Sequence, residues 1–127
     1  MADLAADILI LDDNKDISFM MKSILKYAGF EARICDNRDQ LVSQLDIALP
    51  RLILMDMLLA GADGKDICRE LKNNAITGSI PIIMISAHPD AAKACLDVGA
   101  DEFLEKPFEI DVFLNKTKHF LGEGTVA

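Results

Sequence analysis

The sequence has few cysteines, and their arrangement excludes two classes of small protein. The three cysteines, Cys35, Cys68 and Cys95, are odd in number and widely spaced, and no C-x-x-C pair occurs. This pattern supports neither a disulfide framework nor a zinc site. We interpret the three side chains as small apolar residues of a protein in a reducing compartment.

Long apolar stretches are also absent from the sequence. The longest candidate, LILMDMLLA, is interrupted by Asp56, and no run approaches the roughly 20 apolar residues that a membrane span needs. The first ten residues, MADLAADILI, lack the basic region of a secretory signal peptide. We therefore expect a cytoplasmic protein without a membrane partner.

Basic residues are in the minority. The 13 Lys and Arg residues stand against 21 Asp and Glu residues, which gives a formal net charge of −8 and a pI near 4.6. So acidic a chain repels phosphate groups, and we expect no direct contact with nucleic acid. The same acidity suits the binding of a divalent cation wherever carboxylates cluster.

Length and composition indicate one compact domain. The chain has 127 residues, of which 51% are hydrophobic and 27% are charged, and this composition excludes a disordered chain. No linker, repeat or low-complexity stretch interrupts the sequence. We expect one domain over residues 1–127, with its core over about 5–121 and a loose tail over 122–127.

Short apolar runs alternate with helical patterns along the chain. The runs expected to be strands are Ile8–Leu11, Phe30–Cys35, Leu52–Met55, Ile82–Ile85 and, more weakly, Phe103–Leu104. Three of them are apolar without alternation, which indicates strands buried on both faces, as in a parallel sheet covered by helices. Apolar residues at helical spacing follow each run, and four of these patterns end at Gly29, Pro50, Gly99 and Gly122. Five strand–helix units predict a doubly wound α/β domain.

The first helical pattern contains two neighbouring methionines, Met20 and Met21, and we expect both in the core.

Polar residues follow the predicted strands at the points where the strands end. They are Asp12 and Asp13, Asp56, Ser86 and Lys106. In doubly wound folds ligands bind at the carboxyl ends of the strands, so these side chains are expected at one edge of the sheet. Three acids close together repel one another unless a cation intervenes, and their oxygen atoms suit Mg²⁺. A metal, an ammonium and a hydroxyl would together neutralise a phosphoryl group, and one carboxylate could accept it.

Five motifs in this order resemble the receiver domain of bacterial two-component response regulators. The motifs are LDDN at 11–14, LMDM at 54–57, ISA at 85–87, GAD at 99–101 and LEKPF at 104–108. The resemblance covers essentially the whole chain. It implies a (βα)5 sandwich with the flavodoxin-like strand order 2-1-3-4-5. It also implies a protein that is not an enzyme with a separate substrate, although it catalyses its own phosphorylation and dephosphorylation.

The resemblance implies a role for each residue at the strand ends. Asp56 would accept the phosphoryl group from the phosphohistidine of a sensor histidine kinase or a histidine phosphotransfer protein. The Mg²⁺ ligands would be the carboxylates of Asp12, Asp13 and Asp56 and the backbone carbonyl of Leu58. Lys106 would be the ion partner of the phosphate. The downstream protein partner stays unknown.

Other residues would respond to the phosphate or control its lifetime. By the same resemblance, Ser86 is the switch hydroxyl and Phe103 takes the place of the switch aromatic. The bond before Pro107 is expected to be cis. In similar domains the side chains two positions after the acceptor and two after the switch hydroxyl flank the path of the hydrolytic water. Here those residues are Leu58 and His88.

The sequence departs from the family pattern in two places. The family often has a proline four residues after the acceptor, where this chain has Ala60, so a more mobile loop is expected after Asp56. Lys106 follows Ser86 by 20 positions, which is somewhat closer than in similar sequences. The missing residues must come from the loop or the helix that follows Ser86.

Three other classes of protein share part of this pattern. A small Mg²⁺-dependent phosphatase or phosphotransferase would share the acidic cluster but needs a substrate pocket, and no stretch here is long enough for an inserted cap. A flavodoxin-like nucleotide binder needs a phosphate-cradling loop after the first strand, where this chain has DDNKD. A degenerate receiver that acts only as a docking module would not need the residues of the phosphorylation site, but here every one of those positions is filled.

Overall fold

Five parallel strands form the central sheet of the protein, whose computed structural model describes residues 7–59 and 61–122. The strand order is β2-β1-β3-β6-β7, and all four pairings are parallel. The strands are β1 (Ile8–Leu11), β2 (Ala32–Cys35), β3 (Leu52–Asp56), β6 (Ile82–Ser86) and β7 (Glu102–Glu105). Counted along this sheet alone, the order is 2-1-3-4-5, so the expected doubly wound α/β architecture is confirmed.

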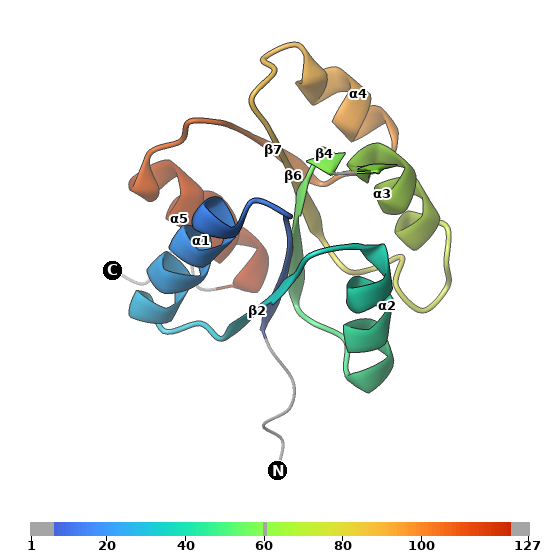
Figure 1. Ribbon diagram of the computed structural model, residues 1–127, viewed down its shortest axis with the longest axis horizontal. Helices are drawn as coiled ribbons and strands as arrows, with labels where there is room; N and C mark the ends of the chain where they lie inside the picture. Colours follow the sequence, from blue (N-terminus) through green and yellow to red (C-terminus); the bar gives the residue numbers. More distant parts are fainter. Residues whose placement is uncertain (1–6, 60, 123–127) are drawn as a thin grey trace.

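Helices cover both faces of the sheet (Figure 1). One face carries α1 (Lys15–Tyr27) and α5 (Ile110–Leu121), and the other carries α2 (Arg38–Ile47), α3 (Gly64–Lys72) and α4 (Ala91–Asp97). Each face has its own apolar core. Within β1, Ile8 and Ile10 belong to the core under α1 and α5, whereas Leu9 and Leu11 belong to the opposite core. This two-sided burial explains why the strand is apolar without alternation.

The helix boundaries follow capping residues that the apolar pattern alone does not mark. The side chain of Asn14 accepts hydrogen bonds from the backbone N–H groups of Asp16 and Ile17 and so caps α1. Asn37 caps α2 in the same way, and this helix therefore begins at Arg38, before its first buried residue. At the end of the first helical segment Gly29 has a φ of 98°, a conformation that favours glycine.

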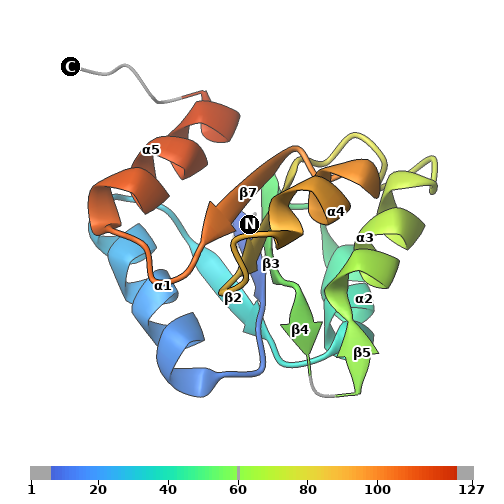
Figure 2. The same cartoon turned by 90° about the horizontal axis from the view of Figure 1, so that it is seen from above.

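A short hairpin between β3 and α3 was not expected from the sequence. Its antiparallel strands are β4 (Leu58–Leu59) and β5 (Ala62–Asp63). Figure 2 shows that the hairpin leads directly into α3. Ala60, where the family proline is missing, lies outside the described residues. The segment after Ser86, which is expected to be shorter than in similar sequences, contains α4, and at seven residues α4 is the shortest of the described helices.

One expectation about the core was wrong. Met20 is 43% exposed, whereas its neighbour Met21 is fully buried. Successive residues of a helix point about 100° apart, so one of two adjacent positions faces the sheet and the other turns toward solvent. The three cysteines are free and buried, as small apolar residues are expected to be. Among the described residues no helix is long and apolar enough to cross a membrane.

Candidate functional site

Three aspartates meet at the carboxyl ends of β1 and β3. Asp12 and Asp13 follow β1 directly, and Asp56 is the last residue of β3. The strands β1 and β3 are neighbours and pair in parallel. One carboxylate oxygen from each residue lies within 4.8 Å of the other two. The structure thus brings together the acids that the topology placed at one edge of the sheet.

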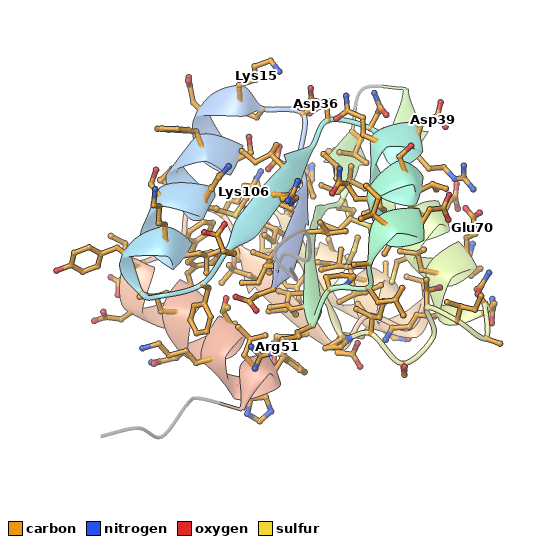
Figure 3. The ribbon with its side chains drawn as sticks, turned by 90° about the horizontal axis from the view of Figure 1, so that it is seen from below. Lys15, Asp36, Asp39, Arg51, Glu70 and Lys106 are labelled. Carbon is orange, nitrogen blue, oxygen red and sulfur yellow. The ribbon has the colours of Figure 1, made fainter. Side chains whose placement is uncertain are left out.

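The ammonium group of Lys106 lies among these carboxylates. Its Nζ atom is 3.4 Å from Oδ1 of Asp56 and 3.6 Å from Oδ2 of Asp12. Lys15, the first residue of α1, instead forms an ion pair of 3.3 Å with Asp36 beyond the end of β2 (Figure 3). Lys106 is the one ammonium that the described residues bring within 4 Å of Asp12 or Asp56, so negative charge exceeds positive charge around these two carboxylates and favours a further cation.

The most buried of the three carboxylates has an unsatisfied oxygen. Asp12 is 1% exposed, and its Oδ1 accepts the backbone N–H of Asn14 at 2.9 Å. Its Oδ2 accepts no hydrogen bond among the described residues, and the Nζ atom of Lys106 lies 3.6 Å away from it. A buried oxygen of this kind is costly without a partner, and a cation held by the cluster would supply one.

The charged form of Asp56 is disfavoured in this environment. Burial raises the pKa of the Asp56 carboxyl above its usual value, and the nearby charge of Asp12 raises it further. The Lys106 ammonium and the backbone N–H of Leu58 lower this pKa, but they do not cancel the effect of burial. A second positive charge would favour the carboxylate form, because opposite charge offsets desolvation.

Replacing this carboxylate is expected to stabilise the protein when no metal is present. Since burial raises the pKa of Asp56, the folded state holds the proton to a higher pH than the unfolded state does. Stability is therefore lost as the pH rises from the ordinary value of about 3.9 through the raised native value. In EDTA at neutral pH, Asp56→Asn should unfold at a higher temperature than the wild type, and thermal unfolding across this pH range measures the difference. An equal or lower midpoint for the variant would show that burial of the charged carboxylate does not destabilise the fold.

The hydroxyl expected to act as a switch lies at the end of β6. Ser86 is 2% exposed, and its Oγ accepts the backbone N–H of His88 at 3.0 Å. The backbone N–H of Lys106 donates to the Ser86 carbonyl at 2.8 Å, which fixes the main chains of the two residues side by side. In this conformation the hydroxyl oxygen accepts a hydrogen bond from the loop that follows β6.

The other residues singled out in the sequence are exposed or half-buried. Leu58 is 57% exposed, and His88 is exposed in the loop after β6. Phe103 in β7 is half-buried and packs against the core under α2, α3 and α4. The bond between Lys106 and Pro107 is cis.

Sequence reasoning missed one residue that lies against the site. Gly64 is the first residue of α3, and its backbone N–H donates to the carbonyl of Met57 at 2.7 Å. The dipeptide Asp63-Gly64 is a turn and helix-start signal that could have drawn attention to this position, but nothing in the spacing shows how closely it approaches the end of β3.

The comparisons with known proteins agree with this geometry. The model of the response regulator receiver domain family matches residues 8–118. The chain belongs to the response regulator receiver family. Receivers in this family accept a phosphoryl group on an aspartate and are not enzymes with a separate substrate, and the aspartate triad beside Lys106 is the acidic pocket typical of them.

The chain is similar to the receivers of several different proteins. The chain is 39% identical over 103 residues to the phosphate regulon transcriptional regulatory protein PhoB of Pseudomonas aeruginosa, which covers 80% of this chain and 45% of PhoB. Among solved structures, the receiver domain of NtrX from Brucella abortus has a TM-score of 0.85 at 32% identity and covers 91% of this chain and 98% of that one. The receiver domain of a signal transduction histidine kinase from Syntrophus aciditrophicus has a TM-score of 0.84 at 30% identity, with coverages of 97% and 95%. The chain thus spans less than half the length of curated relatives such as PhoB.

Proposed function

We propose that this receiver takes a phosphoryl group onto Asp56 from the phosphohistidine of a sensor histidine kinase or a histidine phosphotransfer protein. The observation that carries the proposal is the meeting of three carboxylates, with oxygens within 4.8 Å of one another, beside the ammonium of Lys106. The proposal places the domain in the cytoplasm, where receivers typically work.

The residues of the cluster fit Mg²⁺. Carboxylates of Asp12, Asp13 and Asp56 offer hard oxygen ligands. The buried Oδ2 of Asp12 accepts no hydrogen bond from the described residues, and a cation would supply the missing partner. The backbone carbonyl of Leu58, two residues beyond Asp56, is the further ligand proposed. When bound, Mg²⁺ would supply positive charge that offsets the negative charge on the oxygens of the incoming phosphoryl group.

The chemical step is a transfer between two nucleophiles. A carboxylate oxygen of Asp56 attacks the phosphorus, a new O–P bond forms, and the N–P bond of the donor histidine breaks. The imidazole nitrogen keeps the electron pair of that bond. The imidazole then takes up a proton from solvent and becomes a neutral histidine. The Lys106 ammonium then moves from pairing with a carboxylate to pairing with phosphoryl oxygens.

Phosphorylation would shift the domain between two conformations. The Ser86 hydroxyl, which now accepts the N–H of His88, would turn to donate to a phosphoryl oxygen. Phe103 would move inward from its half-buried position in β7. The surface made by α4, β7 and α5 would change as a result, and a downstream protein would read it. The charge of −8 argues against direct contact of this domain with nucleic acid.

Incubation with acetyl phosphate tests the proposal without knowledge of the cognate kinase. In the presence of Mg²⁺ the intact mass should increase by one phosphoryl group per chain, because a small phosphodonor meets the same acceptor and metal. Addition of excess EDTA should abolish the increase, since the excess negative charge of the cluster then repels the donor. An unchanged mass with Mg²⁺, or equal uptake in EDTA, would contradict the proposal.

The exposed side chain of Leu58 is expected to slow the loss of the phosphoryl group. Hydrolysis needs a water in line with the phosphorus, opposite the Asp56 oxygen, and an apolar side chain that is 57% exposed beside this path cannot orient one. Leu58→Asn should speed the loss by about tenfold, equivalent to about 1.4 kcal/mol of barrier. The decay of the acyl phosphate at fixed Mg²⁺ measures this effect, and Leu96→Asn, which changes an exposed leucine of α4, is the control. Equal rates for the wild type and Leu58→Asn would show that Leu58 does not shield the site.

A further inference from the structure

The beginning of α3 lies against the main chain of the candidate phosphoacceptor. A Cβ atom built on Gly64 would lie 2.3 Å from the carbonyl oxygen of Asp56 and 3.0 Å from the Cα atom of Met57. Real Cβ atoms essentially never approach closer than 3.0 Å, and both atoms belong to the backbone, so neither can swing aside. Any side chain at this position therefore has to displace either α3 or the end of β3.

The requirement for glycine at position 64 comes from this contact alone. Four other glycines have a positive φ, but Gly64 does not. As the first residue of a helix it has a backbone conformation that alanine also adopts. Its N–H donates to the Met57 carbonyl at 2.7 Å, so a hydrogen bond fixes the same close approach that the Cβ would prevent.

The hairpin between β3 and α3 extends this support to the residue after Met57. Leu58 pairs with Asp63 across the hairpin, and the side chain of Asp63 caps α3 by accepting the N–H of Lys65 at 2.8 Å. On its other side, the N–H of Met57 donates to the carbonyl of Ile85 in the sheet at 2.8 Å. The segment from Asp56 to Leu58 is thus held between the sheet and the first turn of α3.

We propose that Gly64 is a positioning residue for the metal and phosphoryl site. By allowing α3 to begin against the backbone of Asp56 and Met57, it sets where the Asp56 carboxylate and the Leu58 carbonyl lie relative to Asp12 and Asp13. The inference rests on the proposed function for the identity of the cation, but the placement of the segment is a property of the protein itself.

The direct test compares two glycine substitutions that each force a Cβ atom against a backbone carbonyl oxygen. Gly64→Ala should weaken Mg²⁺ binding by about tenfold or more, as happens when groups that orient metal ligands are displaced. The matched control is Gly78→Ala, because a Cβ there would lie 2.9 Å from the Asn74 carbonyl oxygen and 3.0 Å from that of Lys72, in the loop after α3. Both variants should unfold at a lower temperature, whereas only Gly64→Ala should lose affinity in a Mg²⁺ titration.

An unchanged Mg²⁺ affinity of Gly64→Ala, or an equal loss in Gly78→Ala, would overturn the inference and leave the proposed function standing. If the wild type itself binds no Mg²⁺, the proposed function fails, and the amide signals of Met57 and Leu58 in the metal-free proteins still test the placement. They should shift in Gly64→Ala and stay in place in Gly78→Ala, and the reverse would overturn the inference.

A second pair of variants covers the case in which Gly64→Ala does not fold. Asp63→Ala removes the cap of α3, whereas Asp63→Asn keeps a side-chain oxygen that accepts the N–H of Lys65 and removes the same charge. Mg²⁺ affinity should fall further in Asp63→Ala than in Asp63→Asn. Equal affinities would show that the start of α3 does not position the metal ligands.

Discussion

Asp56→Asn is expected to take up no phosphoryl group from acetyl phosphate under conditions that phosphorylate the wild type completely. The amide is nearly the same size as the carboxylate, so the packing at the end of β3 is retained. It lacks the negative charge that attacks phosphorus and that pairs with Lys106 at 3.4 Å. It also removes one of the three carboxylates that make up the candidate metal site. Intact-mass measurement over time follows the uptake.

A matched control separates the loss of the acceptor from the loss of any acidic residue. Asp46 is exposed near the end of α2, and Asp46→Asn makes the same chemical change away from the cluster. This variant should be phosphorylated at the wild-type rate. Uptake by Asp56→Asn that matched Asp46→Asn would mean that another residue accepts the phosphoryl group.

Lys106→Ala is expected to be phosphorylated about 10²–10³ times more slowly than the wild type, the usual cost of removing one donor that stabilises a transferring group. The ammonium is the single cation that the described residues place within 4 Å of Asp56, so the variant loses the positive charge nearest the acceptor. Mg²⁺ should bind Lys106→Ala at least as tightly as the wild type, because a competing positive charge has been removed from the three carboxylates.

The two readouts of Lys106→Ala distinguish its role from that of a metal ligand. Lys93 on α4 pairs with Asp97 at 2.9 Å on an exposed face, so Lys93→Ala should change neither phosphorylation nor Mg²⁺ affinity. Weaker Mg²⁺ binding by Lys106→Ala would indicate that the lysine supports the shape of the cluster. A wild-type rate of phosphorylation would show that it does not contact the transferring group.

The fold could be predicted from the sequence because its strands are short, continuous apolar runs. Runs such as Ile8–Leu11 are buried on both faces, and a pattern without alternation is typical of that environment. The hairpin of β4 and β5 could not be found this way, since each strand has only two residues. Periodicity has no meaning over so short a segment, and the pairing depends on where β3 ends and α3 begins.

The acidic cluster could be predicted because topology alone brings strand ends together. Asp12 follows β1 and Asp56 ends β3, which are neighbouring parallel strands, so their separation along the chain does not determine their distance in space. The orientation of Ser86 toward the N–H of His88 depends on a loop conformation that the motif does not encode. The close approach of Gly64 to Asp56 also requires coordinates, because a glycine in the sequence does not reveal which backbone atoms it contacts.

The most direct test of the central claim is to locate the phosphoryl group. The wild type is phosphorylated with acetyl phosphate and Mg²⁺, reduced with borohydride, which converts an aspartyl phosphate to homoserine, and mapped by peptide mass spectrometry. The account predicts homoserine at position 56 and at no other aspartate, and none in a sample from which Mg²⁺ has been removed. Homoserine at position 12 or 13, or a phosphoryl group that survives reduction on a serine or a histidine, would contradict it.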